Sequence, residues 1–148
     1  MQTTLKQLRA AHACTERYKF LRTALGPNYG DSTPITMTQI LDINGLDDCL
    51  WALSHTQDCG NFLRSFLCDC AERVLPIFEK WDATDKRPHN CIAVTRAFIE
   101  GKATREEMQQ AEDWAADASR AAEAAEAARA AELQWQTDHL RELLEALP

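Results

Sequence analysis

Residues that break helices are scarce in this chain. Five glycines and five prolines stand among its 148 residues, and neither type occurs between Arg105 and Leu147. With so few glycines, the chain has no glycine-rich loop of the kind that cradles a phosphate. No apolar run approaches the roughly 18 residues that read as a membrane-spanning helix, which excludes such a helix. No segment resembles a strand hairpin either, so the sequence predicts an all-α fold.

Positive charge is scarce at the C-terminal end. Residues 1–99 hold eleven acidic and eleven basic residues, whereas residues 100–148 hold twelve acidic and five basic ones. The second segment therefore accounts for the whole formal charge of −7. Because such a segment repels the phosphate backbone, direct binding of nucleic acid is disfavoured. A protein partner with a basic surface is favoured instead.

Length and composition indicate one domain. The chain is long enough for a single core, and its 45% share of hydrophobic residues is ordinary for a globular protein. The first 25 residues scatter five basic side chains among apolar ones and lack the continuous apolar stretch of a secretory signal. We therefore expect a cytoplasmic protein with no membrane partner.

Apolar spacing and turn signals predict helices along most of the chain. The single domain of residues 1–148 is expected to comprise N-terminal helices and a turn segment over 1–35, central helices over 36–101, and a long helix over 104–147. Helix starts are expected at Thr3 or Thr4, at Glu16, at Thr36 or Thr38, at Asp47, at Asp58 and near Pro88. Pro76 should kink or end the central helix, because it removes one backbone donor.

The C-terminal segment is predicted to be one acidic, alanine-rich helix. The run Thr104-Arg105-Glu106-Glu107 fits a capping box, and twelve of the 21 residues from Ala111 to Ala131 are alanine. A continuous helix would span about 63 Å, against about 30 Å for a compact domain of this size. Such a helix must project, bend, pair with another chain, or break within residues 132–136.

The cysteines and histidines form no recognisable reactive or metal-binding motif. No cysteine pair has the spacing of a zinc site, and neighbours two apart in a helix, such as Cys68 and Cys70, point in different directions. We interpret the six cysteines as core-filling thiols in a reducing compartment. No catalytic, cofactor-binding or metal-binding residue is predicted, and an enzyme dependent on a thiol or metal is the less favoured alternative.

Charged residues within the helices have two possible roles. Five of them form either an ion-pair network that joins helices or a polar binding groove: Arg64, Asp69, Glu72, Arg73 and Arg96. The basic residues of the first 25 positions could dock on the acidic last helix. The acidic face of that helix is either a solvated exterior or a surface for a basic protein. As partner-binding residues we predict Glu106, Glu107, Glu112, Asp113, Asp117, Glu123 and Glu126, and the same face extends to Glu132.

Several motifs resemble those of the putative immunity proteins of the Imm-5-like kind. They are the runs at residues 44–53 (NGLDDCLWAL), 68–76 (CDCAERVLP), 85–88 (DKRP) and 96–98 (RAF), the alanine-rich segment, and the run from Trp135 to Leu144. The resemblance covers roughly residues 36–147. His89 and Cys91 depart from it, because an arginine and a small apolar residue are expected there.

The resemblance implies a protein of bacteria or phages that neutralises a toxin or nuclease by binding it. A phage-encoded inhibitor of a host defence enzyme would likewise act by binding its target. No active site and no binding residues carry over from the family. The alternative from a different class is a structural or assembly protein that forms a homodimer through its alanine-rich helix.

Overall fold

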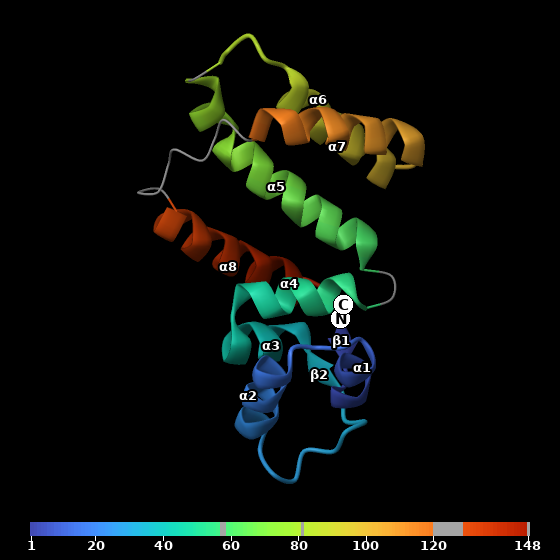
Figure 1. Ribbon diagram of the computed structural model, residues 1–148, viewed down its shortest axis with the longest axis vertical. Coiled ribbons are helices and arrows are strands. Elements are labelled where there is room, and N and C mark those ends of the chain that lie inside the picture. The colour runs from blue at the N-terminus through green and yellow to red at the C-terminus, as the bar shows by residue number, and fades with distance from the viewer. Residues whose placement is uncertain (57–58, 81, 120–128, 148) are drawn as a thin grey trace. The chain divides into compact units, whose positions relative to one another are not determined.

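The computed structural model describes residues 1–56, 59–80, 82–119 and 129–147 (Figure 1). Within these residues the chain is all-α, as predicted, with helices α1 to α8 and one short pair of strands. In the same residues, no helix combines the length and the apolar character needed to cross a bilayer.

The first helices begin where side-chain caps satisfy backbone amides. Helix α1 (Leu5–Ala10) starts at Thr4, whose Oγ1 accepts a hydrogen bond from the Gln7 amide at 3.1 Å. Helix α3 (Met37–Asn44) starts with a complete capping box between Thr36 and Gln39. Of the predicted starts at Thr3 or Thr4, the structure confirms Thr4. Of those at Thr36 or Thr38, it confirms Thr36. Helices α2 (Thr15–Leu25) and α4 (Leu46–Ser54) lie within two residues of their predicted positions.

The all-α fold includes one short pair of strands that the sequence did not indicate. Strand β1 (Gln2–Thr3) pairs antiparallel with β2 (Ile35–Thr36), with Thr3 opposite Ile35. Each strand has only two residues, too few to show alternating polarity, and 31 residues separate the ends that pair. The pairing therefore depends on burial of Thr3 and Ile35, which are 5% and 0% exposed.

The central helix passes through its proline. Helix α5 (Gly60–Glu79) contains Pro76 and continues to Glu79, so of the two predicted outcomes the end of the helix at Pro76 was wrong, and a kink stays a prediction. The site is the last turn, where few downstream residues depend on the lost hydrogen bond. The predicted cap at Asp58 lies outside the described residues. Helix α6 (Arg87–Ile99) then carries Pro88 in its first turn, as predicted.

The C-terminal segment contains two described helices, α7 (Arg105–Ser119) and α8 (Arg129–Glu145). Residues 120–128 between them lie outside the described residues, so the continuity of the predicted 104–147 helix stays a prediction. The suggested break within residues 132–136 was wrong, because α8 runs through these positions without interruption.

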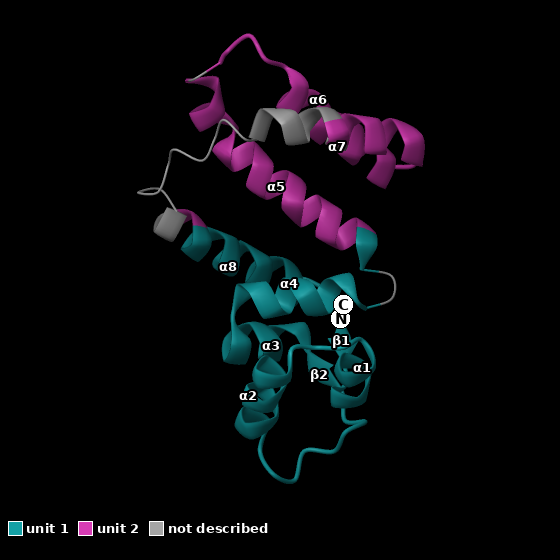
Figure 2. Cartoon of the chain, viewed as in Figure 1, with its two compact units in different colours: residues 1–60, 133–148 teal, residues 61–132 magenta. Residues whose placement is uncertain are grey.

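The chain divides into two compact units, coloured separately in Figure 2. Unit 1 comprises residues 1–60 and 133–148, and unit 2 comprises residues 61–132. The single domain expected from the sequence stays a prediction. In unit 1, the buried side chains of Leu140 and Leu144 show that α8 completes the core of the first 60 residues. Arg141 of α8 also forms an ion pair with Asp42 of α3.

In unit 2, α6 packs against α7, and both lie beside each other in Figure 1. Buried side chains come from α5, α6 and α7 alike: Phe66, Cys68, Ile92, Thr95, Met108 and Ala111. Met108 and Ala111 are three residues apart on α7, so one side of this helix faces the core. The other side carries Glu106 and Asp113, two of the predicted acidic residues, and both are exposed.

Candidate functional site: an acidic face on helix α7

Helix α7 is fixed at its start by the predicted capping box. The Thr104 amide donates to Glu107 Oε2 at 2.8 Å, and the Glu107 amide donates to Thr104 Oγ1 at 3.2 Å. The carboxylate of Glu107 is exposed but already serves this cap. Glu107, one of the predicted partner-binding residues, therefore has a structural role at the start of α7.

Glu106 and Asp113 lie together on the exposed side of α7. They are seven residues apart, almost two full helical turns, and both are exposed. Gln109 lies between them and donates from Nε2 to Asp113 Oδ1 at 3.1 Å, which orients that carboxylate. Because Met108 and Ala111 are buried on the opposite side, the two carboxylates point away from the core of unit 2.

This acidic face is completed by residues that the sequence analysis did not single out. Arg105, Gln109 and Gln110 line the same shallow surface as Glu106 and Asp113. Gln109 and Gln110 follow Glu106 by three and four residues, a spacing that could have identified them, and Arg105 directly precedes Glu106. We define the α7 face by its five lining residues: Arg105, Glu106, Gln109, Gln110 and Asp113.

The remaining predicted partner-binding residues are not part of the α7 face as described. The side chains of Glu112 and Asp117, and the whole of Glu123 and Glu126, lie outside the described part of the structure. Glu132, which the sequence placed on the same face, forms an ion pair with Arg73 of α5 at 3.0 Å. It thus serves internal pairing within unit 2.

The basic residues near the N-terminus also pair locally. Arg22 and Arg9 contact Asp31 at 2.9 and 3.4 Å, and Arg17 contacts Asp48 at 3.1 Å. Among the described residues, their partners therefore belong to the first 60 positions and not to the last helix.

The charged residues of α5 form the ion-pair network that was one of the two predicted alternatives. Arg96 of α6 donates from Nη2 to Asp69 Oδ1 at 2.6 Å and from Nε to Glu72 Oε1 at 2.8 Å. These contacts raise the pKa of Arg96, first through Glu72 and then through Asp69. The guanidinium therefore stays charged and joins α5 to α6.

Replacing Arg96 by alanine should lower the free energy of unfolding by about 1–2 kcal/mol, allowing for the partial exposure of all three groups. The substitution leaves the neighbouring carboxylates of Asp69 and Glu72 without their shared cation. Urea denaturation followed by circular dichroism measures the free energy of unfolding. Arg105→Ala, an equally large truncation at an exposed helix start, is the control and should change stability by less than about 0.5 kcal/mol. Equal losses of stability in the two variants would contradict a stabilising role of the Arg96 ion pairs.

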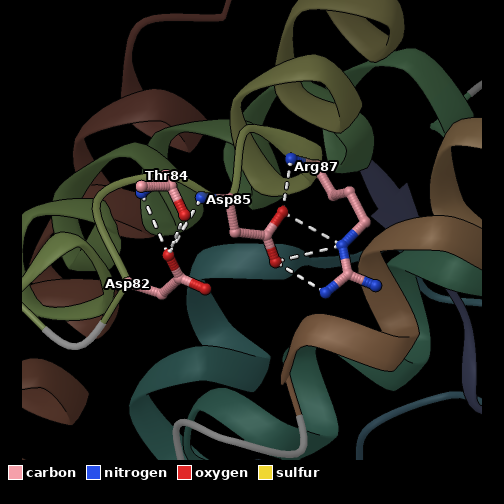
Figure 3. A network of polar contacts seen from close by, with 4 residues as sticks. All are labelled: Asp82, Thr84, Asp85 and Arg87. Atoms are coloured by element: carbon pink, nitrogen blue, oxygen red, sulfur yellow. Dashed lines mark hydrogen bonds and ion pairs between the residues drawn. The ribbon is translucent and has the colours of Figure 1, made fainter.

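The connection between α5 and α6 is organised by two aspartates (Figure 3). Asp82 Oδ1 accepts from the Thr84 hydroxyl at 2.7 Å and from the amides of Thr84 and Asp85. Asp85 in turn accepts from the Arg87 amide at 2.9 Å and from its guanidinium at 2.6 Å. Asp85 and Arg87 belong to the DKRP motif of the sequence, and the hydrogen bond from the Arg87 amide to Asp85 lies at the start of α6.

These hydrogen bonds act on the carboxylates as well. Thr84 lowers the pKa of Asp82, and Arg87 lowers the pKa of Asp85. Because the pKa of each carboxyl is lower in the folded protein than in the unfolded chain, its contribution to stability is complete at pH values above the ordinary carboxyl pKa. It is lost as the pH falls through the lowered values. The α5–α6 connection is thus held most firmly near neutral pH.

The cysteines divide into buried and accessible thiols. Cys49, Cys59 and Cys68 are buried, as predicted for core-filling residues, whereas Cys14 is exposed, so that interpretation was wrong for Cys14. Burial raises the pKa of the Cys49 thiol to about 12 and that of half-buried Cys70 to about 11. In the part of the chain that the structure describes, no three His, Cys, Asp or Glu side chains are placed to hold a metal ion.

With a thiol reagent such as dithiobisnitrobenzoate at pH 7.5, we expect Cys14 to react first. Cys49 and Cys70 should react slowly in the native protein because they remain protonated, and rapidly after denaturation. Peptide mapping of labelled samples assigns each phase. Rapid labelling of Cys49 or Cys70 in the folded protein would contradict the burial described here.

Residues 53–136 match the family model described as Imm-5 like putative immunity protein. The matched segment covers more than half of the chain and includes α5, α6, α7 and the α7 face. No curated protein and no solved structure matches the chain.

Proposed function

Because the chain belongs to the Imm-5 like putative immunity protein family, we propose that it binds a protein target through the α7 face and blocks it stoichiometrically. The target is a toxin, a nuclease or a defence enzyme with a basic surface. The observation that carries this proposal is the exposed pair Glu106 and Asp113, directed away from the core on a helix inside the family segment.

Charge complementarity explains how such a surface would act. A basic active-site surface and an acidic helix attract each other over about 10 Å at moderate ionic strength, which speeds encounter. A nuclease or other enzyme that binds anionic substrates needs basic residues around its active site. Occupying those residues would exclude the substrate, with no bond made or broken by the inhibitor.

The acidic excess of residues 100–148 supports the same choice of target. It disfavours direct contact with nucleic acid, since two polyanions repel each other. The proposal includes no membrane contact and no cofactor. It extends to a phage protein that neutralises a host defence enzyme, because that enzyme would be recognised by the same charge pattern.

The test begins with capture of a partner from a lysate of the native host on the tagged full-length protein. Salt should release the partner, since exposed charge pairs weaken as screening increases. The purified partner is then titrated with the protein, and its activity should fall linearly to an end point near one inhibitor per target. Inactivation by far smaller amounts would indicate an enzyme and would refute stoichiometric binding.

A further inference from the structure

A groove in unit 1 shares no lining residue with the α7 face. It lies between α2, α3 and α4 and has a volume of about 280 Å³. The buried side chains of Leu21 and Ile40 line it, together with half-buried Tyr18 and Trp51. We call it the α2–α4 groove. Sites that take apolar groups in proteins have this composition, largely aliphatic and aromatic with a few polar groups.

One aromatic side of the groove is held in place by its neighbours. The Trp51 ring stacks on His55, with centroids 4.3 Å apart and planes 28° apart. His55 Nδ1 lies 2.9 Å from the Trp51 carbonyl oxygen, which fixes the imidazole against the same helix. A partner side chain would therefore meet a preformed aromatic surface, and little side-chain entropy would be lost on binding.

The charges that line the groove leave one carboxylate for a partner. Asp48 accepts from Arg17 Nε at 3.1 Å and from Asn44 Nδ2 at 2.6 Å, so Arg17 is already compensated. Asp47 lines the same groove and is exposed, and within the described residues no hydrogen bond or ion pair engages its carboxylate. The groove thus combines an apolar lining with one negative charge.

We propose that the α2–α4 groove receives an apolar side chain of the protein partner that is adjacent to a lysine or arginine. The apolar group contacts Tyr18 and Trp51, and the neighbouring cation pairs with Asp47. This inference rests on the proposed function, because the occupant belongs to the same protein target. A volume of about 280 Å³ suits one side chain, since sites for larger ligands run from about 300 to 1,000 Å³.

Buried apolar anchors of this kind often dominate the free energy of protein association. The α7 face alone would supply mainly charge pairs, which accelerate encounter more than they slow dissociation. An apolar group buried in the groove would therefore slow dissociation of the partner.

The first test uses the capped dipeptide amide acetyl-phenylalanyl-lysine as the probe on full-length, isotope-labelled protein. We expect saturable chemical-shift changes for Tyr18, Asn44 and the Trp51 indole. Replacing the peptide lysine by glutamate should weaken binding about fivefold, the size of one exposed ion pair, and Asp47→Asn should remove this difference. No shifts up to the solubility limit, shifts located elsewhere, or equal binding of both peptides would overturn the inference.

The second test blocks the groove covalently. Cys14 is exposed and lines the groove, so alkylation with N-phenylmaleimide places a bulky ring there. The alkylated protein should lose the peptide-induced shifts, whereas Cys14→Ser protein treated with the same reagent should keep them. Circular dichroism verifies that both proteins stay folded. Unchanged peptide binding by the alkylated protein would contradict the proposed location.

The same alkylated protein separates this inference from the proposed function. With the captured partner, alkylation should weaken inhibition at least tenfold, while the treated Cys14→Ser protein inhibits normally. Full inhibition by the alkylated protein, lost only on charge reversal of Glu106 and Asp113, would overturn the groove inference alone. Absence of inhibition by every form would overturn the proposed function, and the peptide titration would still decide whether the groove binds this pair of side chains.

Discussion

Replacing Leu140 by alanine is expected to lower the free energy of unfolding by about 3 kcal/mol, within the range of about 2–5 kcal/mol measured for buried leucines. Leu140 is 0% exposed and lies on α8, in the part of that helix that belongs to unit 1. The substitution removes buried apolar surface and leaves a cavity between α8 and the first 60 residues. Thermal denaturation should show a melting temperature lower by roughly 6–12 °C.

The same helix supplies a matched control for this prediction. Leu133 is also on α8 but is 52% exposed. Leu133→Ala makes the same chemical change in the same helix and should alter stability by less than about 0.5 kcal/mol. Similar losses in both variants would mean that α8 does not complete the core of unit 1, and that Leu140 is not selectively buried.

Reversing both charges of the α7 face should weaken the complex with the partner by about tenfold to a hundredfold. In the double variant Glu106→Lys with Asp113→Lys, attraction of a basic surface becomes repulsion, which slows association and opposes docking. Stability should fall by only about 1 kcal/mol, because both side chains are exposed but Glu106 lies in the first turn of α7, where negative charge is favourable. Surface plasmon resonance with the captured partner gives both rate constants, and the association rate should lose most of its salt dependence.

A control with equal net charge tests whether position matters. Glu142→Lys with Glu145→Lys changes the total charge by the same amount on exposed positions of α8. These lysines would lie near the C-terminus of the helix, where positive charge is favourable. This variant should bind nearly as well as the natural chain. If both double variants bind equally poorly, total charge rather than the α7 face governs recognition.

Local signals in the sequence predicted most helix starts. Thr36 with Gln39, and Thr104 with Glu107, form the reciprocal hydrogen bonds of capping boxes, which depend on residues only three apart. Pro88 and the acidic pair Asp47 and Asp48 likewise occupy first turns. Such features need no distant partner, so the sequence pattern is sufficient to locate them.

Two pairings between residues that are far apart in the chain were not predicted. The short strand pair joins the start of the chain to Ile35, and Glu132 pairs with Arg73 of α5 instead of extending the acidic face. Neither pairing has a periodic signal, because each involves only one or two residues per segment. The groove next to Trp51 was not predicted for the same reason, since its lining comes from separate helices.

The sequence by itself determined the all-α class, the main helices and the concentration of negative charge in the last third of the chain. These properties follow from composition and from spacings of three or four residues, which act within a single helix. Only the tertiary structure decided which acidic side chains are exposed. Glu106 and Asp113 face outward because Met108 and Ala111 are buried, and the core that buries them is assembled from segments far apart in the chain.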